Sequence, residues 1–369
     1  MYPRVFRVVA LSFTTMAVAL ASSTVPVQAE PGSGAHTGVS AAGTVAAITD
    51  RLARQLAAPL AGDARRAGLF SATEAAATGT ALSGAAASPA LDGALRQANR
   101  DVLAAKGLPA DGPSLLRLRL AHPDMRAALS RGEAPLVAAA PADDVATTVT
   151  AYAGDGAKVL LDARKVPRQP VFVVEVDTAK ALPLGLDVLR SVLDRHGITG
   201  AQPAADGGYW ATQVRSVRLN DDKEPWIKGD AEIFGITGGF GLDGKVAVDT
   251  VTMPYLDNDG TTYYPNQLIV HFSAYKYNLA DFVMMEDDGD TNYQSLAVAL
   301  ASALLTIVDG GAYVPLVNAI LNAIPASWWT DDPDYVDSWY TLSTATGGQL
   351  NGAAGNGSMS LAPYWVAPL

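Results

Sequence analysis

The chain has 369 residues, 49% of them hydrophobic, so it is long enough for two or three domains with cores of their own. Its formal net charge of -11 argues against a nucleic-acid-binding protein and against simple attraction to anionic lipid. The absence of cysteine excludes disulfides, thiolate metal sites and a cysteine nucleophile.

Residues 1–29 are typical of a secretory signal peptide. Two arginines precede the apolar run 8–21, and small residues follow up to Ala29. Cleavage after Ala21, or retention of the segment as an anchor, is the alternative. Residues 30–44 are rich in Gly, Ser and Ala and indicate a linker. We therefore expect a secreted, extracellular protein.

Residues 45–142 are rich in Ala, Leu and Arg and predict a small α-helical region. One expected helix face carries apolar residues at steps of three and four, namely Val45, Ile48, Leu52 and Leu56. A second helix is predicted to begin at Ser88-Pro89 and to end at Gly107, because proline suits a first helical turn and glycine suits the residue after a last turn.

A short α/β bridging segment is expected over residues 143–205. Strands at 147–153 and 159–162 flank a Gly-Asp-Gly turn and predict a hairpin. The run VFVVEV at 171–176 is typical of a strand covered on both faces, and residues 184–196 carry the pattern of an amphipathic helix.

Residues 206–369 favour an antiparallel β-sandwich, because short apolar runs alternate there with Gly- and Asp-containing turns. The predicted strands are 212–219, 231–237, 245–253, 267–272, 282–285, 338–342 and 358–361. Two apolar stretches, 295–308 and 314–324, interrupt the pattern and predict an inserted helical hairpin. The expected fold is therefore α+β.

Acidic loops join these strands. From Leu219 onward the chain has 19 Asp and Glu but only four Lys and no Arg, a local net charge of -15. Clustered carboxylates repel one another unless a cation screens them, and calcium takes six to eight oxygen ligands. The candidate calcium ligands are Asp221, Asp222, Glu224, Asp257, Asp259, Glu286, Asp287, Asp288 and Asp290.

The same loops have a simpler interpretation as solvated turns, because Asp-Gly is an ordinary hairpin signal. They do not fit a helix–loop–helix calcium site, since neither Gly260 nor Gly289 lies at the turn position between the required acidic ends. The calcium hypothesis therefore depends on whether the loops meet in space.

Three segments together resemble a family of secreted bacterial proteins of unknown function: residues 214–234, MPYLDNDGTTYYPNQ at 253–267, and MEDDGDTNY at 285–293 with the later DDPDYVDSWYTL. The resemblance spans most of the mature chain and implies no established reaction. The acidic, Trp-containing loop that leads into GDAEIF is also similar, more distantly, to calcium-binding β-sandwiches of the synaptotagmin type. That pattern usually places adjacent acids before the strand, whereas Ala231 separates Asp230 from Glu232 here.

Two other classes of function stay open. A secreted hydrolase could use paired carboxylates, Glu224 with Glu232 or Glu286, although no serine-hydrolase elbow or zinc-protease motif is present. A membrane-acting, pore-forming protein could use the apolar hairpin 295–324, although each stretch is short for a bilayer span. The expected partner is an extracellular glycan, protein or lipid, and membrane association is not favoured.

Overall fold

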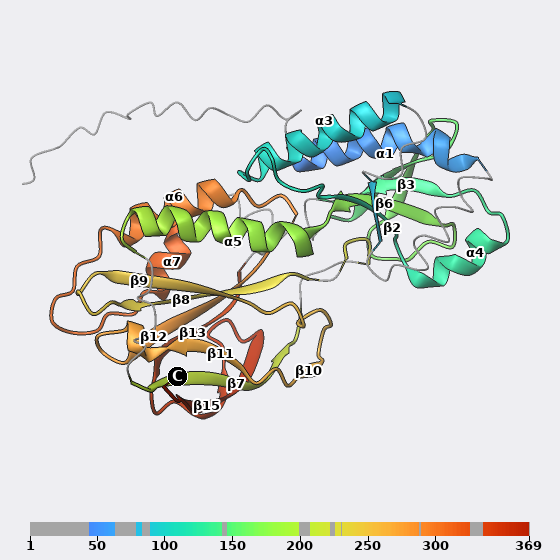
Figure 1. Ribbon diagram of the computed structural model, residues 1–369. Helices are drawn as coiled ribbons and strands as arrows, with labels where there is room; N and C mark the ends of the chain where they lie inside the picture. Colours follow the sequence, from blue (N-terminus) through green and yellow to red (C-terminus); the bar gives the residue numbers. More distant parts are fainter. Residues whose placement is uncertain are drawn as a thin grey trace, which may run out of the picture. The chain divides into compact units, whose positions relative to one another are not determined.

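The computed structural model describes residues 44–62, 79–82, 89–141, 146–198, 207–221, 226–229, 231–287, 289–324 and 335–368. The predicted signal peptide and nearly all of the predicted linker lie outside these residues, as does Ser88 at the predicted start of the second helix. The described chain is a mixed α+β protein built from helices and largely antiparallel sheets (Figure 1).

The first sheet has six strands in the order β1-β2-β6-β3-β4-β5. The strands are β1 (Thr80–Ala81), β2 (Leu116–Leu120), β3 (Leu136–Ala139), β4 (Thr148–Tyr152), β5 (Lys158–Asp162) and β6 (Val171–Val176). Only the β3–β6 pair is parallel. As predicted, β6 is buried along its whole length, and β4 and β5 form an antiparallel hairpin.

The described part of the predicted helical region contains two long helices and the short helix α4 (Arg126–Ser130), as well as three strands of this sheet. Helices α1 (Val45–Ala61) and α3 (Pro89–Ala105) are confirmed, and Gly107 adopts the positive φ of 64° expected after a helix end. The expectation of helix alone is wrong for β2 and β3, which pair with strands beyond residue 143. The prediction of helix rested on the alanine content of the whole region. The sequence LRLRL of β2 instead alternates with the period of a strand.

Helix α5 (Thr178–Arg195) begins six residues before its predicted start and includes Pro183. Its buried face carries Leu182, Leu186 and Leu189, so packing of this face outweighs the hydrogen bond that proline removes. Helix α4 (Arg126–Ser130) is short and follows the 3-10 turn Pro123–Met125.

Two further sheets use the strands predicted after residue 206. The second sheet has the order β10-β7-β15-β14, with β11 also paired to β7; the third has the order β13-β12-β8-β9. The strands are β7 (Tyr209–Leu219), β8 (Ile233–Phe240), β9 (Val246–Thr252), β10 (Thr262–Tyr263), β11 (Gln267–His271), β12 (Leu279–Glu286), β13 (Tyr335–Ser343), β14 (Gly348–Asn351) and β15 (Gly357–Val366). The 3-10 turn Phe272–Ala274 separates β11 from β12.

The third sheet is buried on both sides. One cluster of buried side chains joins it to the second sheet and includes Val214 and Leu361 with Phe282 and Trp339. The other cluster joins it to α5 and to two helices, α6 (Tyr293–Leu304) and α7 (Val317–Ala323). Helix α7 falls within the predicted apolar stretch 314–324, whereas α6 begins two residues before the stretch 295–308. Helix α6 lies against α5 (Figure 1).

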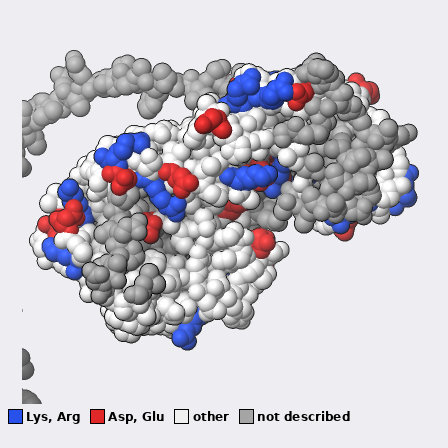
Figure 2. Space-filling model, in the orientation of Figure 1, with Lys and Arg blue, Asp and Glu red and all other residues white. Residues whose placement is uncertain are grey.

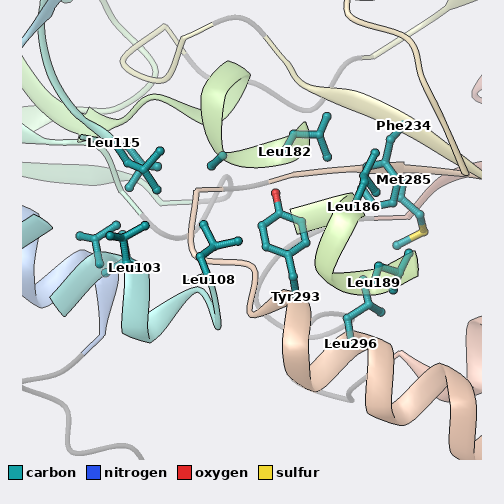
Figure 3. Close-up of a cluster of buried hydrophobic side chains, with 14 of the residues drawn as sticks. Leu103, Leu108, Leu115, Leu182, Leu186, Leu189, Phe234, Met285, Tyr293 and Leu296 are labelled. Atoms are coloured by element: carbon teal, nitrogen blue, oxygen red, sulfur yellow. The ribbon is translucent and has the colours of Figure 1, made fainter. Parts of the chain in front are cut away.

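Tyr293 at the start of α6 connects the core of the third sheet to the helices. Its ring is fully buried and lies near Leu182 and Leu186 of α5 and Leu108 (Figure 3). Gly185 of α5 makes this possible, because a Cβ atom there would lie 2.2 Å from the Tyr293 ring. The contact positions the tyrosine hydroxyl against the charged site described next.

Candidate functional site

A buried ionic network lies on neighbouring strands of the first sheet. The alternation of β2 places Arg117 and Arg119 on one face, and Glu175 of β6 lies opposite Arg117. Arg117 donates through Nε to Glu175 Oε1 at 2.6 Å, and Arg119 donates to both carboxylate oxygens at 2.8 and 2.9 Å. Arg119 also donates to the carbonyl oxygen of Ile227 at 2.6 Å, which ties the first sheet to the loop before β8.

The charges in this network stabilise one another. Burial by itself raises the pKa of Glu175, but the two guanidinium groups outweigh it, so the pKa lies below its ordinary value. Burial likewise opposes the charge of Arg117, yet its carboxylate neighbours, chiefly Glu175, raise its pKa. Glu175 is therefore an ionised, fully paired carboxylate.

A second ion pair links α3 to the loop after β12. Lys106 is fully buried, and its Nζ lies 3.3 Å from Asp287 Oδ1 and 2.9 Å from the carbonyl oxygen of Gly289. The Tyr293 hydroxyl donates to the other oxygen of Asp287, and the Lys106 ammonium lies 5.1 Å from the centre of the Tyr293 ring. A buried pair of this kind is sensitive to loss of either partner.

Glu232, just before β8, is the buried carboxylate that differs from these two. It is 8% exposed and accepts a hydrogen bond from the Thr178 side chain, but it forms no ion pair with any basic side chain that the structure describes. Burial raises its pKa to about 8, with the charges of Asp287 and Glu175 contributing; Thr178 and Arg117 oppose the shift only in part. Glu232 is therefore mostly protonated at neutral pH.

These groups meet at a pocket of about 60 Å³. Its polar wall includes Arg117, Glu175, Thr178, Glu232 and Asp287. The rest of the lining comes from the start of α1, the residues that follow β3, the end of β6, and the loop residues Lys228, Gly229, Gly289 and Asp290. Gly229 fits closely, because a Cβ atom there would lie 3.0 Å from Nη2 of Arg117. Acidic and basic side chains thus surround a space that water or a small charged group can enter.

The predicted calcium ligands divide between this pocket and other places. Asp287 and Asp290 line the pocket, and Glu286 is buried at the end of β12 beside Ile233. Asp222, Glu224 and Asp288 lie outside the described residues, as does Asp230.

The remaining three predicted ligands lie in other contacts. Asp221 is exposed, and Asn356 contacts its backbone. The carboxylate of Asp257 accepts a hydrogen bond at 2.6 Å from the Tyr263 hydroxyl, whereas Asp259 is exposed. None of these three lines the pocket.

The acidic loops nevertheless contact one another at their ends. The amide of Gly260, which ends the second acidic loop (256–260), donates to the carbonyl oxygen of Leu219, where the first acidic loop (219–232) begins, at 2.8 Å. The amide of Asp287 in the third acidic loop (285–293) donates to the carbonyl oxygen of Glu232, where the first loop ends, at 3.1 Å. The first loop therefore contacts the second at one end and the third at the other.

No group of three or more Asp, Glu or His side chains is arranged among the described residues to hold a metal ion. No helix of the described ranges is long and apolar enough to cross a membrane. The hydrolase hypothesis paired Glu224 with Glu232 or Glu286. Glu224 lies outside the described residues, and Glu286 lies on β12 opposite Ile233, which follows Glu232.

The sequence analysis missed the basic half of the site, which comprises Lys106, Arg117 and Arg119, and the partner Glu175. A signal was available for the arginines, because LRLRL alternates with the period of a strand and places both on one face. The charge within the buried run VFVVEV was a second signal, since a buried carboxylate requires a partner. Nothing local in the sequence distinguishes Lys106 from an exposed lysine at a helix end.

The fold and the site define a mixed α+β protein in which acidic loops of an antiparallel sheet meet a buried ionic network of another sheet. The chain belongs to the family described as Protein of unknown function (DUF3103), which matches residues 48–369. Comparisons with curated proteins and with solved structures gave no match.

Proposed function

We propose that the pocket binds a cation and that Glu232 supplies the carboxylate that neutralises it. The observation that carries this proposal is the arrangement of buried charges. Glu175 has two arginine partners and Asp287 has Lys106, whereas Glu232 faces the same pocket without an ion pair among the described residues, and the charge of Arg117 compensates its burial only in part. A buried carboxylate is costly to ionise without a nearby positive charge, so a bound cation would complete the network.

Proton linkage supports the same proposal. The pKa of Glu232 is raised to about 8, chiefly by burial and also by neighbouring negative charge. A cation reverses both effects, because it favours the ionised carboxylate by direct attraction. Binding at pH 7 would therefore release about one proton, and affinity would rise with pH until Glu232 is ionised in the free protein.

Calcium is the cation that we propose first, and the ammonium group of a small ligand shares the chemistry. Carboxylates, a hydroxyl and carbonyl oxygens are hard ligands of the kind that calcium prefers, and Thr178, Glu232 and Asp290 bring such oxygens to the pocket. A space of about 60 Å³ has room for roughly four water-sized groups, so an ion could keep part of its hydration shell.

The scaffold in this proposal is an exported β-sandwich. The second and third sheets share one buried cluster, which supports packing of two layers face to face. Helices α6 and α7 would form the predicted hairpin and cover the opposite face of the third sheet. Export would place the site in a calcium-containing environment, where weak sites with dissociation constants of about 10⁻⁴ to 10⁻³ M are in use.

A second candidate is calcium bound by the exposed acidic loops rather than in the pocket. The contact between Gly260 and Leu219 favours it, because this contact brings the loop of Asp257 and Asp259 to the loop that begins at Asp221. The two candidates differ in the residues on which binding depends.

Isothermal titration calorimetry of the mature protein would test both. Calcium chloride and methylammonium chloride are titrated at matched ionic strength into the wild type, Glu232→Gln, Asp257→Asn with Asp259→Asn, and the exposed control Glu133→Gln. Buffers of different ionisation enthalpy report the proton release. If the cation binds in the pocket, Glu232→Gln should abolish both the binding and the proton release, and the other variants should retain both. Equal binding by that variant, or no binding of either cation to the wild type, would refute it; loss only in the double variant would move the calcium to the loops.

A further inference from the structure

A second cavity, larger than the charged pocket, lies beside α3. It has a volume of about 260 Å³ and is bounded by α3, by the start of β2 and by the connection between them. We call it the α3 pocket. None of its lining residues belongs to the charged pocket, so an inference about it is independent of the proposed cation site.

The floor of the α3 pocket is apolar. Leu95 and Leu103 of α3, Leu116 of β2 and Leu82 line it, and each is at most 3% exposed. One wall is held by Asn99, which donates to the carbonyl oxygen of Pro113 at 3.2 Å and accepts from the amide of Leu115 at 2.8 Å. The cavity therefore has an apolar floor and a wall in which Asn99 joins α3 to the segment before β2.

The rim carries two arginines and one aspartate. Arg96 and Arg100 line the cavity one helical turn apart and are both exposed, and Asp92 lines it beside Arg96. Arg96 pairs with Asp92, whereas Arg100 donates to the side-chain oxygen of Gln97 and makes no ion pair with a carboxylate in the described ranges. Figure 2 shows basic side chains in blue over α3 on the face that is drawn, with acidic side chains in red beside them. A guanidinium group at the mouth of an apolar cavity favours an anionic partner.

We propose that the α3 pocket binds a free amphiphilic carboxylate, such as a medium-chain fatty acid. The hydrocarbon chain would contact the four leucines, and the carboxylate would pair with Arg100 and, in part, Arg96. The carboxylate is placed at the rim because the arginines there carry the opposite charge, and the hydrocarbon chain is placed on the floor because the floor is apolar. Each methylene added to the chain should strengthen binding about fourfold for as long as it is buried, because its transfer from water is worth about 0.8 kcal/mol.

Calorimetric titration of butanoate, hexanoate and octanoate into the full chain would test the proposal. Octanol and octylammonium probe the charge requirement, and vesicles of anionic phospholipid probe a membrane source. We expect affinity to rise from butanoate to octanoate. Octanoate should also bind more tightly than octanol or octylammonium. Absence of octanoate binding to the wild type, equal binding of octylammonium, or binding to vesicles alone would overturn the proposal.

Two variants and a matched control locate the site. Ala110 lines the cavity from an exposed position, so Ala110→Trp should block it without disturbing the core, whereas Ala104→Trp adds the same side chain at an exposed position of α3 away from the cavity. Arg100→Gln should weaken octanoate about tenfold, as expected for loss of one charge-assisted pair, and leave octanol unchanged. Unchanged octanoate binding by Ala110→Trp would refute the assignment.

Discussion

Replacing Glu232 with glutamine should change how the free energy of unfolding depends on pH. The folded protein holds Glu232 protonated up to a pKa of about 8, whereas the unfolded chain releases this proton at the ordinary value of 4.5. Between these values the folded state binds one more proton than the unfolded state, so the free energy of unfolding decreases as pH rises. Stabilisation from the protonated form is complete below pH 4.5 and is lost by about pH 8.

The magnitude follows from the same two values. One bound proton changes the free energy of unfolding by about 1.4 kcal/mol per pH unit, and the interval from 4.5 to about 8 gives about 5 kcal/mol in total. Glutamine is neutral at every pH and can still accept the hydrogen bond from Thr178. The variant should therefore resemble the wild type near pH 5 and exceed its stability by several kcal/mol above pH 8.

Urea unfolding, followed by tryptophan fluorescence from pH 5 to pH 9 in the presence of a chelator, would measure the effect. The relevant quantity is the difference between wild type and variant at each pH, because other titrating groups cancel in it. Glu133→Gln, at an exposed carboxylate, should show no pH-dependent difference of this kind. Parallel pH profiles for the wild type and Glu232→Gln would refute the reasoning and remove the proton-linkage support for a cation site.

Three further changes test individual buried contacts of the fold. Lys106→Met should lower the free energy of unfolding by about 3–5 kcal/mol, because it leaves Asp287 buried without its ammonium partner; urea midpoints would show this, and adding Asp287→Asn should recover part of the loss. Gly185→Ala should cost about 1–3 kcal/mol through collision with a buried tyrosine ring, whereas Gly93→Ala, with open space at its Cβ, should gain about 0.5–1 kcal/mol; opposite shifts in thermal midpoint are expected. Asp337→Ala should cost about 3 kcal/mol or more, because four backbone amides donate to this fully buried carboxylate; calorimetric melting with and without calcium would show the same loss.

Asp337 illustrates where an acidic sequence is misleading. In the sequence it ends the acidic stretch TDDPDYVD at 330–337 and resembles the other aspartates there. In the structure it is fully buried and accepts hydrogen bonds from the amides of Ser338, Ala354, Asn356 and Gly357. Its role is to hold the turn before β15, because a carboxylate can satisfy several amide donors at once.

Local patterns predicted much of the secondary structure correctly. Helix periodicity identified α1, and strand periodicity with Asp-Gly turns identified the strands after residue 206 except the short β10 and β14. These patterns work because burial of one face imposes a period of 3.6 or of 2 on the sequence. They failed for β2 and β3, where short strands lie in an alanine-rich segment and are stabilised by partners about 35 to 60 residues away, at β6.

The sequence by itself determined that this protein has an α+β fold, acidic loops and no cysteine chemistry, because periodicity, charge and composition are properties of the chain. Only the tertiary structure decided which acids have basic partners. Lys106 meets Asp287 across 181 positions, and Arg117 meets Glu175 across 58. Glu232 is thereby the carboxylate that faces the pocket without such a partner among the described residues. Charge balance in a buried site depends on distances in space, and no local pattern records those distances.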